Sequence, residues 1–371
     1  MSVPVTNNFF KERRSFTEVK KEVFGRYFDA WGETILRRAR ECGEQEFVFI
    51  DLLAVTDPGV LVDDAIPLHK SIIKRPLLNQ KLHNYSYTAY SAHQEALKEQ
   101  LEAQPYYPDF VHPPCLLHNA EAKALMAENI VASGKSLAIL DPFQNKFTQQ
   151  FLQQAVTTCG TDLYMQLLPE NVAKALSGKK TSQPLLDLFG DRLEKIRAYC
   201  RKEKDKARQQ DFMLSQFSAV LQAHGHFTSL FKVNPPQTEL PSCYLLFSSR
   251  DSQAYRIFKE TLLNYSTCQA DGVAEFSANS FPKPQLLLFE HDLEFTIEKL
   301  QERLLENAGL YKYKSIESVY ELDAVNTNYS KENYLTAIEH LRKAGKLELM
   351  NAKTMQLIRQ PVLSAIIKYK L

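Results

Sequence analysis

Two short apolar runs on either side of an amphipathic segment limit the folds open to this chain. Ser136–Asp141 and Asp162–Leu168 have the length and composition of buried strands, and Phe147–Thr158 between them has the periodicity of a helix. A strand, a helix and a strand in succession predict a parallel sheet, because the helix carries the chain back to the edge where the first strand began. The chain is therefore predicted to have an α/β fold.

Further segments extend this sheet. Thr17–Cys42 repeats apolar side chains at helical spacing, and Glu46–Leu53 is a nearly continuous apolar run, typical of a strand covered on both faces. Phe227–Val233 and Ser242–Ser248, separated by Asn234–Pro236, predict an antiparallel hairpin. Parallel units finished by a hairpin are the arrangement of the class I methyltransferase-like, or Rossmann-like, sheet, although many doubly wound folds share its first part.

The last part of the chain has a different pattern. Ser330 is predicted to cap a helix that stops at Gly345, and a short strand follows. A helix that stops and runs into a strand in this way predicts a winged helix. We therefore expect an N-terminal helical segment that packs on the sheet (1–45), a first part of the Rossmann-like core (46–168), a helical insertion (169–224), the hairpin and helix of the core (225–290) and a winged-helix-like C-terminal domain (291–371).

Composition and charge exclude several classes of protein. The 371 residues exceed one compact core and predict two or three domains. A formal net charge of +1 gives no field over the whole protein that would attract nucleic acid, so any such binding must be local. No run approaches the roughly 18 to 20 apolar residues of a membrane span, and the N-terminus lacks a signal-peptide core, so we expect a cytoplasmic protein without a membrane partner.

Metal binding is not predicted either. The 6 cysteines are scattered without a Cys-x-x-Cys pair, so we expect reduced thiols. His224 and His226 are close in sequence, but two histidines without a third ligand do not make a zinc site.

Several motifs resemble those of the three-Cys-motif partner proteins of bacteria. Phe49–Ala54 is similar to the hydrophobic strand of that family, which ends in an acid and an alanine, and Ala65–Leu68 is similar to its Gly-Ser-Pro-Leu segment. The most specific match is Leu140–Phe143, with Thr161–Tyr164 at the expected distance, and Cys243–Arg250 resembles a late strand. The resemblance covers most of the chain. It implies a methyltransferase-like domain with a helical insertion, a C-terminal winged helix and a phage-related partner protein that carries a three-cysteine motif.

A site for S-adenosylmethionine needs small residues after the first strand and an acid near the end of the second. The first loop, Asp51–Gly59, keeps Gly59 but lacks the other usual glycines, and Tyr90–His93 has no acid. We predict that the cofactor-binding residues are Asp51, Ala54, Gly59 and Ser91. The alternative is a degenerate domain that has lost catalysis.

Asp141, Pro142 and Phe143 resemble the Asp-Pro-Pro-aromatic signature of amino methyltransferases, in which the acid holds the target amine and the ring stacks on the base. This geometry suits a flipped or single-stranded base. The three residues are therefore the predicted catalytic residues. A structural turn at the end of a buried strand is the alternative.

Four cations near the predicted last helix are candidates for contact with DNA or RNA: Lys331, Arg342, Lys343 and Lys346. Contacts with protein alone are the alternative for this domain. Two functions follow from the whole sequence. One is a methyltransferase-like protein that acts on or is bound to nucleic acid, and the other is a noncatalytic binding subunit that works with its partner.

Overall fold

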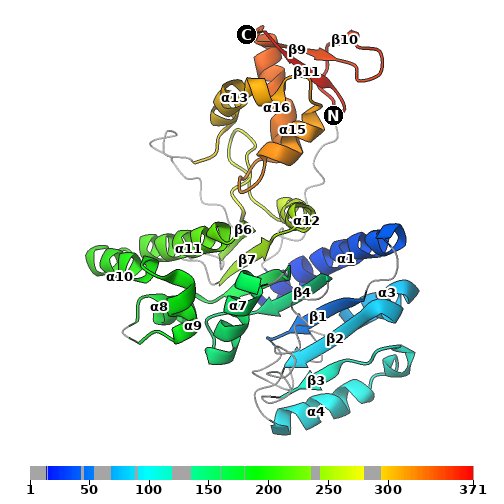
Figure 1. Ribbon diagram of the computed structural model, residues 1–371, viewed down its shortest axis with the longest axis vertical. Coiled ribbons are helices and arrows are strands. Elements are labelled where there is room, and N and C mark those ends of the chain that lie inside the picture. The colour runs from blue at the N-terminus through cyan, green and yellow to red at the C-terminus, as the bar shows by residue number, and fades with distance from the viewer. Residues whose placement is uncertain are drawn as a thin grey trace. The chain divides into compact units, whose positions relative to one another are not determined.

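The structure is a computed structural model that describes residues 14, 16–42, 46–53, 68–87, 91–118, 135–158, 160–178, 180–234, 243–279 and 294–370 (Figure 1). Its contacts divide the chain into two compact units. We call residues 12–261 the sheet unit, and residues 262–371 with residues 1–11 the terminal unit.

The sheet unit is built on a mostly parallel sheet. Its strands are β1 (Phe47–Asp51), β2 (Leu82–Tyr87), β3 (Cys115–Leu117), β4 (Lys135–Leu140), β5 (Asp162–Leu167), β6 (Phe227–Asn234) and β7 (Cys243–Ser249). They lie in the order β3-β2-β1-β4-β5-β7-β6 (Figure 1). β1 to β5 pair in parallel, whereas β7 is antiparallel to both of its neighbours, β5 and β6. This confirms the predicted α/β sheet, with parallel units finished by a hairpin, and its strand order is that of a methyltransferase-like Rossmann fold.

Helices connect the strands of the sheet unit. They are α1 (Phe16–Cys42), α3 (Pro76–Lys81), α4 (Ser91–Glu102), α7 (Lys146–Thr158), α8 (Pro169–Leu176), α9 (Gln183–Phe189), α10 (Arg192–Lys202), α11 (Lys206–Ala223) and α12 (Ser252–Leu263), the last of which crosses the boundary between the units. The four helices α8 to α11 form the helical segment expected between β5 and β6.

Both faces of the sheet are covered, which explains the continuous apolar runs in its strands. Side chains alternate between the two faces along a strand, so Leu163 and Met165 of β5 join one core cluster with residues of α7 and α11. Tyr164 between them faces the opposite side of the sheet. The centroid of its ring lies 5.0 Å from that of Phe24 in α1 and 5.6 Å from that of Phe258 in α12. α1 therefore packs on this face of the sheet.

The terminal unit combines helices with a small sheet. Its elements are β8 (Ser277–Asn279), α13 (Ile297–Glu306), α14 (Ala308–Tyr311), α15 (Ile316–Asp323), α16 (Lys331–Lys343), β9 (Leu347–Met350), β10 (Leu357–Ile358) and β11 (Ile366–Tyr369). The antiparallel sheet has the order β10-β9-β11, and Ser315 forms an isolated bridge to Ile366 of β11. The predicted cap is confirmed, because Ser330 Oγ accepts from Asn333 N–H while Asn333 Oδ1 accepts from Ser330 N–H.

The division between the units falls at Leu262, whereas the sequence placed the last boundary at 291. Residues shortly after α12 pack with the terminal unit. Val273 is part of its apolar core, Gly272 O accepts from Asn333 Nδ2 at 3.0 Å, and Asp271 Oδ2 accepts from Ile297 N–H at 2.9 Å. No periodic pattern in this short segment indicates which core it joins.

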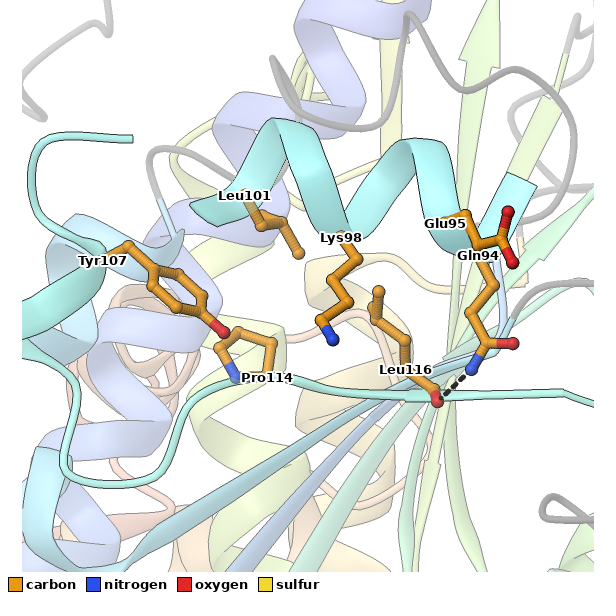
Figure 2. Close-up of a pocket in the computed structure, with 7 residues that line it drawn as sticks. All are labelled: Gln94, Glu95, Lys98, Leu101, Tyr107, Pro114 and Leu116. Carbon is orange, nitrogen blue, oxygen red and sulfur yellow. Dashed lines mark hydrogen bonds between the residues drawn. The ribbon is translucent and has the colours of Figure 1, made fainter. Parts of the chain in front are cut away.

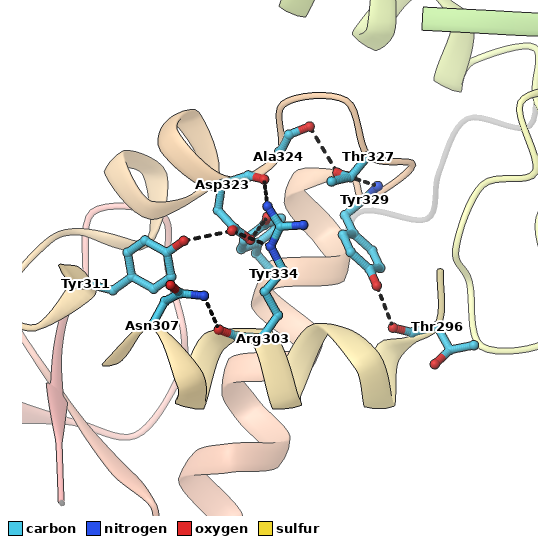
Figure 3. Close-up of polar contacts among 9 residues, drawn as sticks. All are labelled: Thr296, Arg303, Asn307, Tyr311, Asp323, Ala324, Thr327, Tyr329 and Tyr334. Atoms are coloured by element: carbon cyan, nitrogen blue, oxygen red, sulfur yellow. Dashed lines mark hydrogen bonds and ion pairs between the residues drawn. The ribbon is translucent and has the colours of Figure 1, made fainter. Parts of the chain in front are cut away.

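A buried carboxylate organises the terminal unit. Asp323 Oδ1 accepts from Arg303 Nε at 2.6 Å and from Tyr311 OH at 2.7 Å, and Asp323 Oδ2 accepts from Tyr334 OH at 2.5 Å (Figure 3). These four residues come from α13, α14, α15 and α16, so one carboxylate links every helix of the bundle. An ionised carboxylate is a strong acceptor, and these donors offset much of the cost of burying it.

Candidate functional site

The predicted acids lie at the point where the order of the sheet reverses. The chain proceeds from β1 outward to β2 and β3, then returns to place β4 on the other side of β1. In open α/β sheets, ligands bind at such a switch point, beyond the carboxyl ends of the two strands. Asp51 is the last residue of β1, and Asp141 directly follows β4. The register pairs Asp51 with Ile139, which places Asp141 two residues further along the adjacent strand.

The carboxylate of Asp141 is fully engaged within the fold. Its Oδ1 accepts from Phe143 N–H at 2.9 Å and its Oδ2 accepts from Asn171 Nδ2 at 2.6 Å, and the residue is only 4% exposed. Burial raises the pKa of Asp141 above its ordinary value, and the hydrogen bonds from Asn171 and Phe143 oppose that shift. The bond to Phe143 closes a local turn, and Asn171 on α8 fixes the carboxylate from the element that follows β5.

Pro142 and Phe143 are buried beside Asp141. Phe143 belongs to the main core of the sheet unit, and its ring meets that of Phe217 on α11 edge to face, with centroids 5.2 Å apart. A ring packed in this way stabilises the turn after β4. To stack on a substrate base it would have to leave this contact.

Asp51 lies in a more open setting. It is half-buried, and its Oδ1 accepts from Leu53 N–H at 2.8 Å. Leu52 N–H donates to Ile139 O at 2.9 Å, so the chain stays paired with β4 for one residue beyond β1. This fixes the direction of the carboxyl end of β1 at the switch point.

The other predicted cofactor residues are less defined. Ala54 and Gly59 lie outside the described residues, and the structure describes only the backbone of Ser91, at the first residue of α4. At the end of β2 stands Tyr87, whose buried ring stacks on Phe147 of α7 with centroids 4.5 Å apart. The sequence showed an aromatic strand here, but not this contact between segments 60 residues apart in the numbering.

The structure also has a polar cluster at the opposite, amino edge of the sheet. Buried Asp162 at the start of β5 accepts from Trp31 Nε1 at 3.2 Å and from Ser249 Oγ at 2.5 Å. Ser249 Oγ in turn accepts from Asp251 N–H, and Asp251 Oδ2 accepts from Lys135 Nζ at 2.9 Å. Burial raises the pKa of Asp162 to about 7. Trp31 stood out in the sequence only as part of an apolar stripe, and its partner could not be read from that pattern.

A pocket of about 340 Å³ lies between α4 and β3 (Figure 2). The side chain of Gln94 donates to Leu116 O at 2.8 Å at one end, and Tyr107 lies at the other. Lys98 projects from α4 between them. β3 is separated from β1 by β2, so this pocket is distinct from the switch point between β1 and β4.

The four predicted nucleic-acid residues lie in and directly after α16. Glu339 binds Arg342 through two hydrogen bonds, with Nε at 2.7 Å and Nη2 at 2.8 Å, and its Oε1 lies 3.5 Å from Lys343 Nζ. Lys331 Nζ lies 5.6 Å from the ring centroid of Tyr320, and Lys346 is exposed. Two of the four cations are therefore partly neutralised by a carboxylate of the same helix.

Metal-ligand clusters and membrane-spanning helices are absent from the part of the chain that the structure describes. There, no three His, Cys, Asp or Glu side chains gather as metal ligands, and no helix is long and apolar enough to cross a membrane. His226 Nδ1 hydrogen-bonds to Ser248 Oγ at 2.9 Å, and burial lowers its pKa to about 4. Among the described cysteines, Cys115, Cys200, Cys243 and Cys268 form no disulfide.

Comparisons with known proteins add little to the strand order. The sequence matches no protein-family model and no curated protein. Among solved structures, the plantazolicin methyltransferase BpumL in complex with SAH is 10% identical, with 64% of this chain and 86% of that one covered at a TM-score of 0.32. The glycopeptide N-methyltransferase MtfA complexed with sinefungin is 10% identical, with 59% and 86% covered at a TM-score of 0.30. YjhP from E. coli is 14% identical, with 65% of this chain and 98% of that one covered at a TM-score of 0.26. The fold assignment therefore rests on the order and direction of the strands.

Proposed function

We propose that this chain is a methyltransferase-like protein that binds S-adenosylmethionine at the switch point between β1 and β4 and acts on, or is bound to, nucleic acid. The observation that carries the proposal is the placement of Asp51 and Asp141, two acids that end the strands flanking the switch point. The methyltransferase-like strand order supports the choice of cofactor.

The described residues fit the cofactor in part. Asp51 is half-buried at the carboxyl end of β1 and is the described side chain best placed to hold a ligand there. Ala54 and Gly59, which follow β1 in the sequence, and Ser91 at the start of α4 are the other proposed cofactor-binding residues. When bound, S-adenosylmethionine supplies an activated methyl group, while the protein would orient the acceptor.

Asp141, Pro142 and Phe143 are proposed to lie nearest the acceptor base. For Asp141 to hold an amine, its Oδ2 would exchange the hydrogen bond from Asn171 for one from the substrate. Transfer of tritium from methyl-labelled S-adenosylmethionine to a mixture of DNA and RNA tests this role. The proposal expects incorporation by the full chain and its loss in Asp141→Ala at a temperature where that variant is folded.

A second candidate is a noncatalytic binding subunit that works with a three-Cys-motif partner. The observation in its favour is that both oxygens of Asp141 are already satisfied, while Phe143 is packed in the core. It predicts no tritium incorporation together with binding of nucleic acid that weakens with salt. Incorporation that depends on Asp141 would exclude it.

The terminal unit is proposed to be a winged helix. In support, α13, the isolated bridge at Ser315, α15, α16, β9 and β11 occur in the order helix, bridge, helix, helix, strand, strand. The short α14 lies between α13 and Ser315, and the short β10 lies between β9 and β11. A winged helix is a unit that can bind DNA or RNA, and Lys331, Arg342, Lys343 and Lys346 are its proposed contacts.

A further inference from the structure

The outer face of the small sheet in the terminal unit carries lysines. Ile367 and Tyr369 of β11 are buried, so Lys368 points to the opposite face of the strand. Register pairs Lys368 with Glu348 of β9, and Glu348 lies 3.4 Å from Lys368 Nζ and 2.9 Å from Lys370 Nζ. Lys370 N–H donates to the carbonyl of exposed Lys346, so a third lysine lies beside this pair.

An exposed tyrosine lies next to these lysines. Tyr313 N–H donates to Ile367 O at 2.8 Å, so its backbone runs beside β11 one residue from Lys368. The residue is 55% exposed, and Lys312 Nζ lies 5.3 Å from the centroid of its ring. The face of this ring is therefore accessible to a ligand at the surface.

The backbone of Tyr313 is also strained. Its φ is +63°, a left-handed conformation that is rare for bulky side chains. A glycine would satisfy this turn at lower cost. An outlier of this kind supports a hypothesis of function.

Charge favours this face over α16. Lys368 and Lys370 share one carboxylate, that of Glu348, and exposed Lys312 and Lys346 add two further cations. α16 instead mixes its cations with two carboxylates, Glu332 and Glu339. We call Tyr313 together with Lys312, Lys346, Lys368 and Lys370 the lysine face.

We propose that the lysine face binds single-stranded nucleic acid, with its lysines on the phosphates and a base stacked on Tyr313. The proposal rests on the nucleic-acid part of the proposed function and gives that function a location. Lysines beside an exposed aromatic ring are what single strands require, because every base presents a flat face and every nucleotide a phosphate. A base pair inside a duplex does not offer that face to a side chain.

The test is fluorescence anisotropy of the full chain with a fluorescein-labelled oligo(dT) of about 20 nucleotides at several salt concentrations, using three double variants. Lys368→Gln/Lys370→Gln should weaken binding on the order of tenfold and make the slope of log affinity against log salt shallower by about 1.4, because each phosphate contact contributes about 0.7. Lys202→Gln/Lys206→Gln, at two exposed lysines of the sheet unit, is the matched control, and its affinity should stay within about twofold of the wild type. A third double variant, Lys331→Gln/Lys343→Gln, tests the contacts proposed on α16.

Tyr313 has its own matched pair of variants. Tyr313→Gly removes the ring but suits the positive φ, so the fold is retained while binding weakens about tenfold. Tyr313→Phe keeps the ring and should bind like the wild type. If Tyr313→Phe loses affinity as Tyr313→Gly does, stacking on the ring is refuted.

The outcomes distinguish the lysine face from the proposed nucleic-acid function on which it rests. No binding by the wild-type chain overturns the nucleic-acid function itself. Binding that is lost in Lys331→Gln/Lys343→Gln but kept in Lys368→Gln/Lys370→Gln leaves that function standing and overturns the lysine face. A duplex of the same length that competes as well as the single strand overturns the preference for single strands.

Discussion

Raising the pH from about 4 to about 7 should destabilise the sheet unit through one carboxyl group, that of Asp162. Burial raises its pKa to about 7 in the folded chain, against about 3.9 for an unfolded Asp. Across this window the folded state holds a proton that the unfolded state has released, so the free energy of unfolding falls as pH rises. Below about pH 4 and above about pH 7 the group adds no further pH dependence.

The magnitude follows from the two pKa values. Each unit of difference is worth about 1.4 kcal/mol, so Asp162 lowers the free energy of unfolding by about 4 kcal/mol between pH 4 and pH 7. Other groups act in the opposite direction. Burial lowers the pKa values of His69 and His226 to about 4, so these side chains cost stability as pH falls. Comparison with Asp162→Asn, which cannot titrate, isolates the contribution of Asp162.

The assay is urea unfolding followed by tryptophan fluorescence. Trp31 is the single tryptophan of the chain, lies in the sheet unit and donates to Asp162, so its emission reports on this unit and on this carboxyl group. The stability difference between wild type and Asp162→Asn should change by about 1.4 kcal/mol per pH unit between pH 4 and pH 7. The native emission of Trp31 should titrate with a midpoint near 7 in the wild type alone.

Asp187→Asn, at an exposed carboxyl group of the same unit, is the control and should retain the wild-type titration. A stability difference that is flat in pH, or Trp31 emission that does not change across the window, would refute the reasoning about Asp162.

Three further predictions concern stability. Asp323→Ala should destabilise the terminal unit by about 3 kcal/mol, because it leaves buried hydroxyls and Arg303 without their acceptor. Hydrogen exchange of residues 294–370 would show the loss as weaker protection, and unchanged protection would contradict the role of this carboxylate. Asp141→Ala should lower the free energy of unfolding of the sheet unit by about 2 to 3 kcal/mol and Asn171→Ala by about 1 kcal/mol, both measured by urea unfolding. Equal losses in the two variants would contradict a separate contribution from the hydrogen bond that Asp141 accepts from Phe143 N–H. Ser330→Ala should lower the free energy of unfolding of the terminal unit by about 1 kcal/mol, because α16 loses its N-cap, and the same exchange experiment measures this. Ser364→Ala, at an exposed serine of the same unit, is the control, and an equally large effect there would contradict the role of the cap.

The central elements of the sheet could be predicted from the sequence because they are buried on both faces. The predicted strand 136–141, helix 147–158 and strand 162–168 are observed as Lys135–Leu140, Lys146–Thr158 and Asp162–Leu167. Their continuous apolar runs leave few alternatives to a central strand.

The bounds of elements that depend on distant partners were predicted less accurately from the sequence. Residues 85–90 have a weak strand pattern in the sequence, but β2 runs from Leu82 to Tyr87, because Leu82 already pairs with Phe47 of β1. Leu82–Asn84 is not an apolar run and has no local strand signal. Pairing with a neighbour, and not local propensity, determines where this strand begins.

In the candidate site, too, local features could be predicted and distant contacts could not. Asp51 and Asp141 could be placed at one edge because strand ends are local features and the topology follows from them. The partners of Asp141 and Asp162 could not, because Asn171 lies 30 residues from Asp141, and Trp31 lies 131 residues from Asp162. Such contacts depend on how the helices pack against the sheet.

Calorimetric titration of the full chain with S-adenosylhomocysteine tests the central claim most directly, since it examines the switch point without a known acceptor. We predict stoichiometric binding in the micromolar range that weakens at least tenfold in Asp51→Asn and is unchanged in Glu95→Gln, at the separate pocket beside β3. No detectable binding by the wild-type chain, or equal binding by Asp51→Asn, would contradict a cofactor site at the carboxyl end of β1.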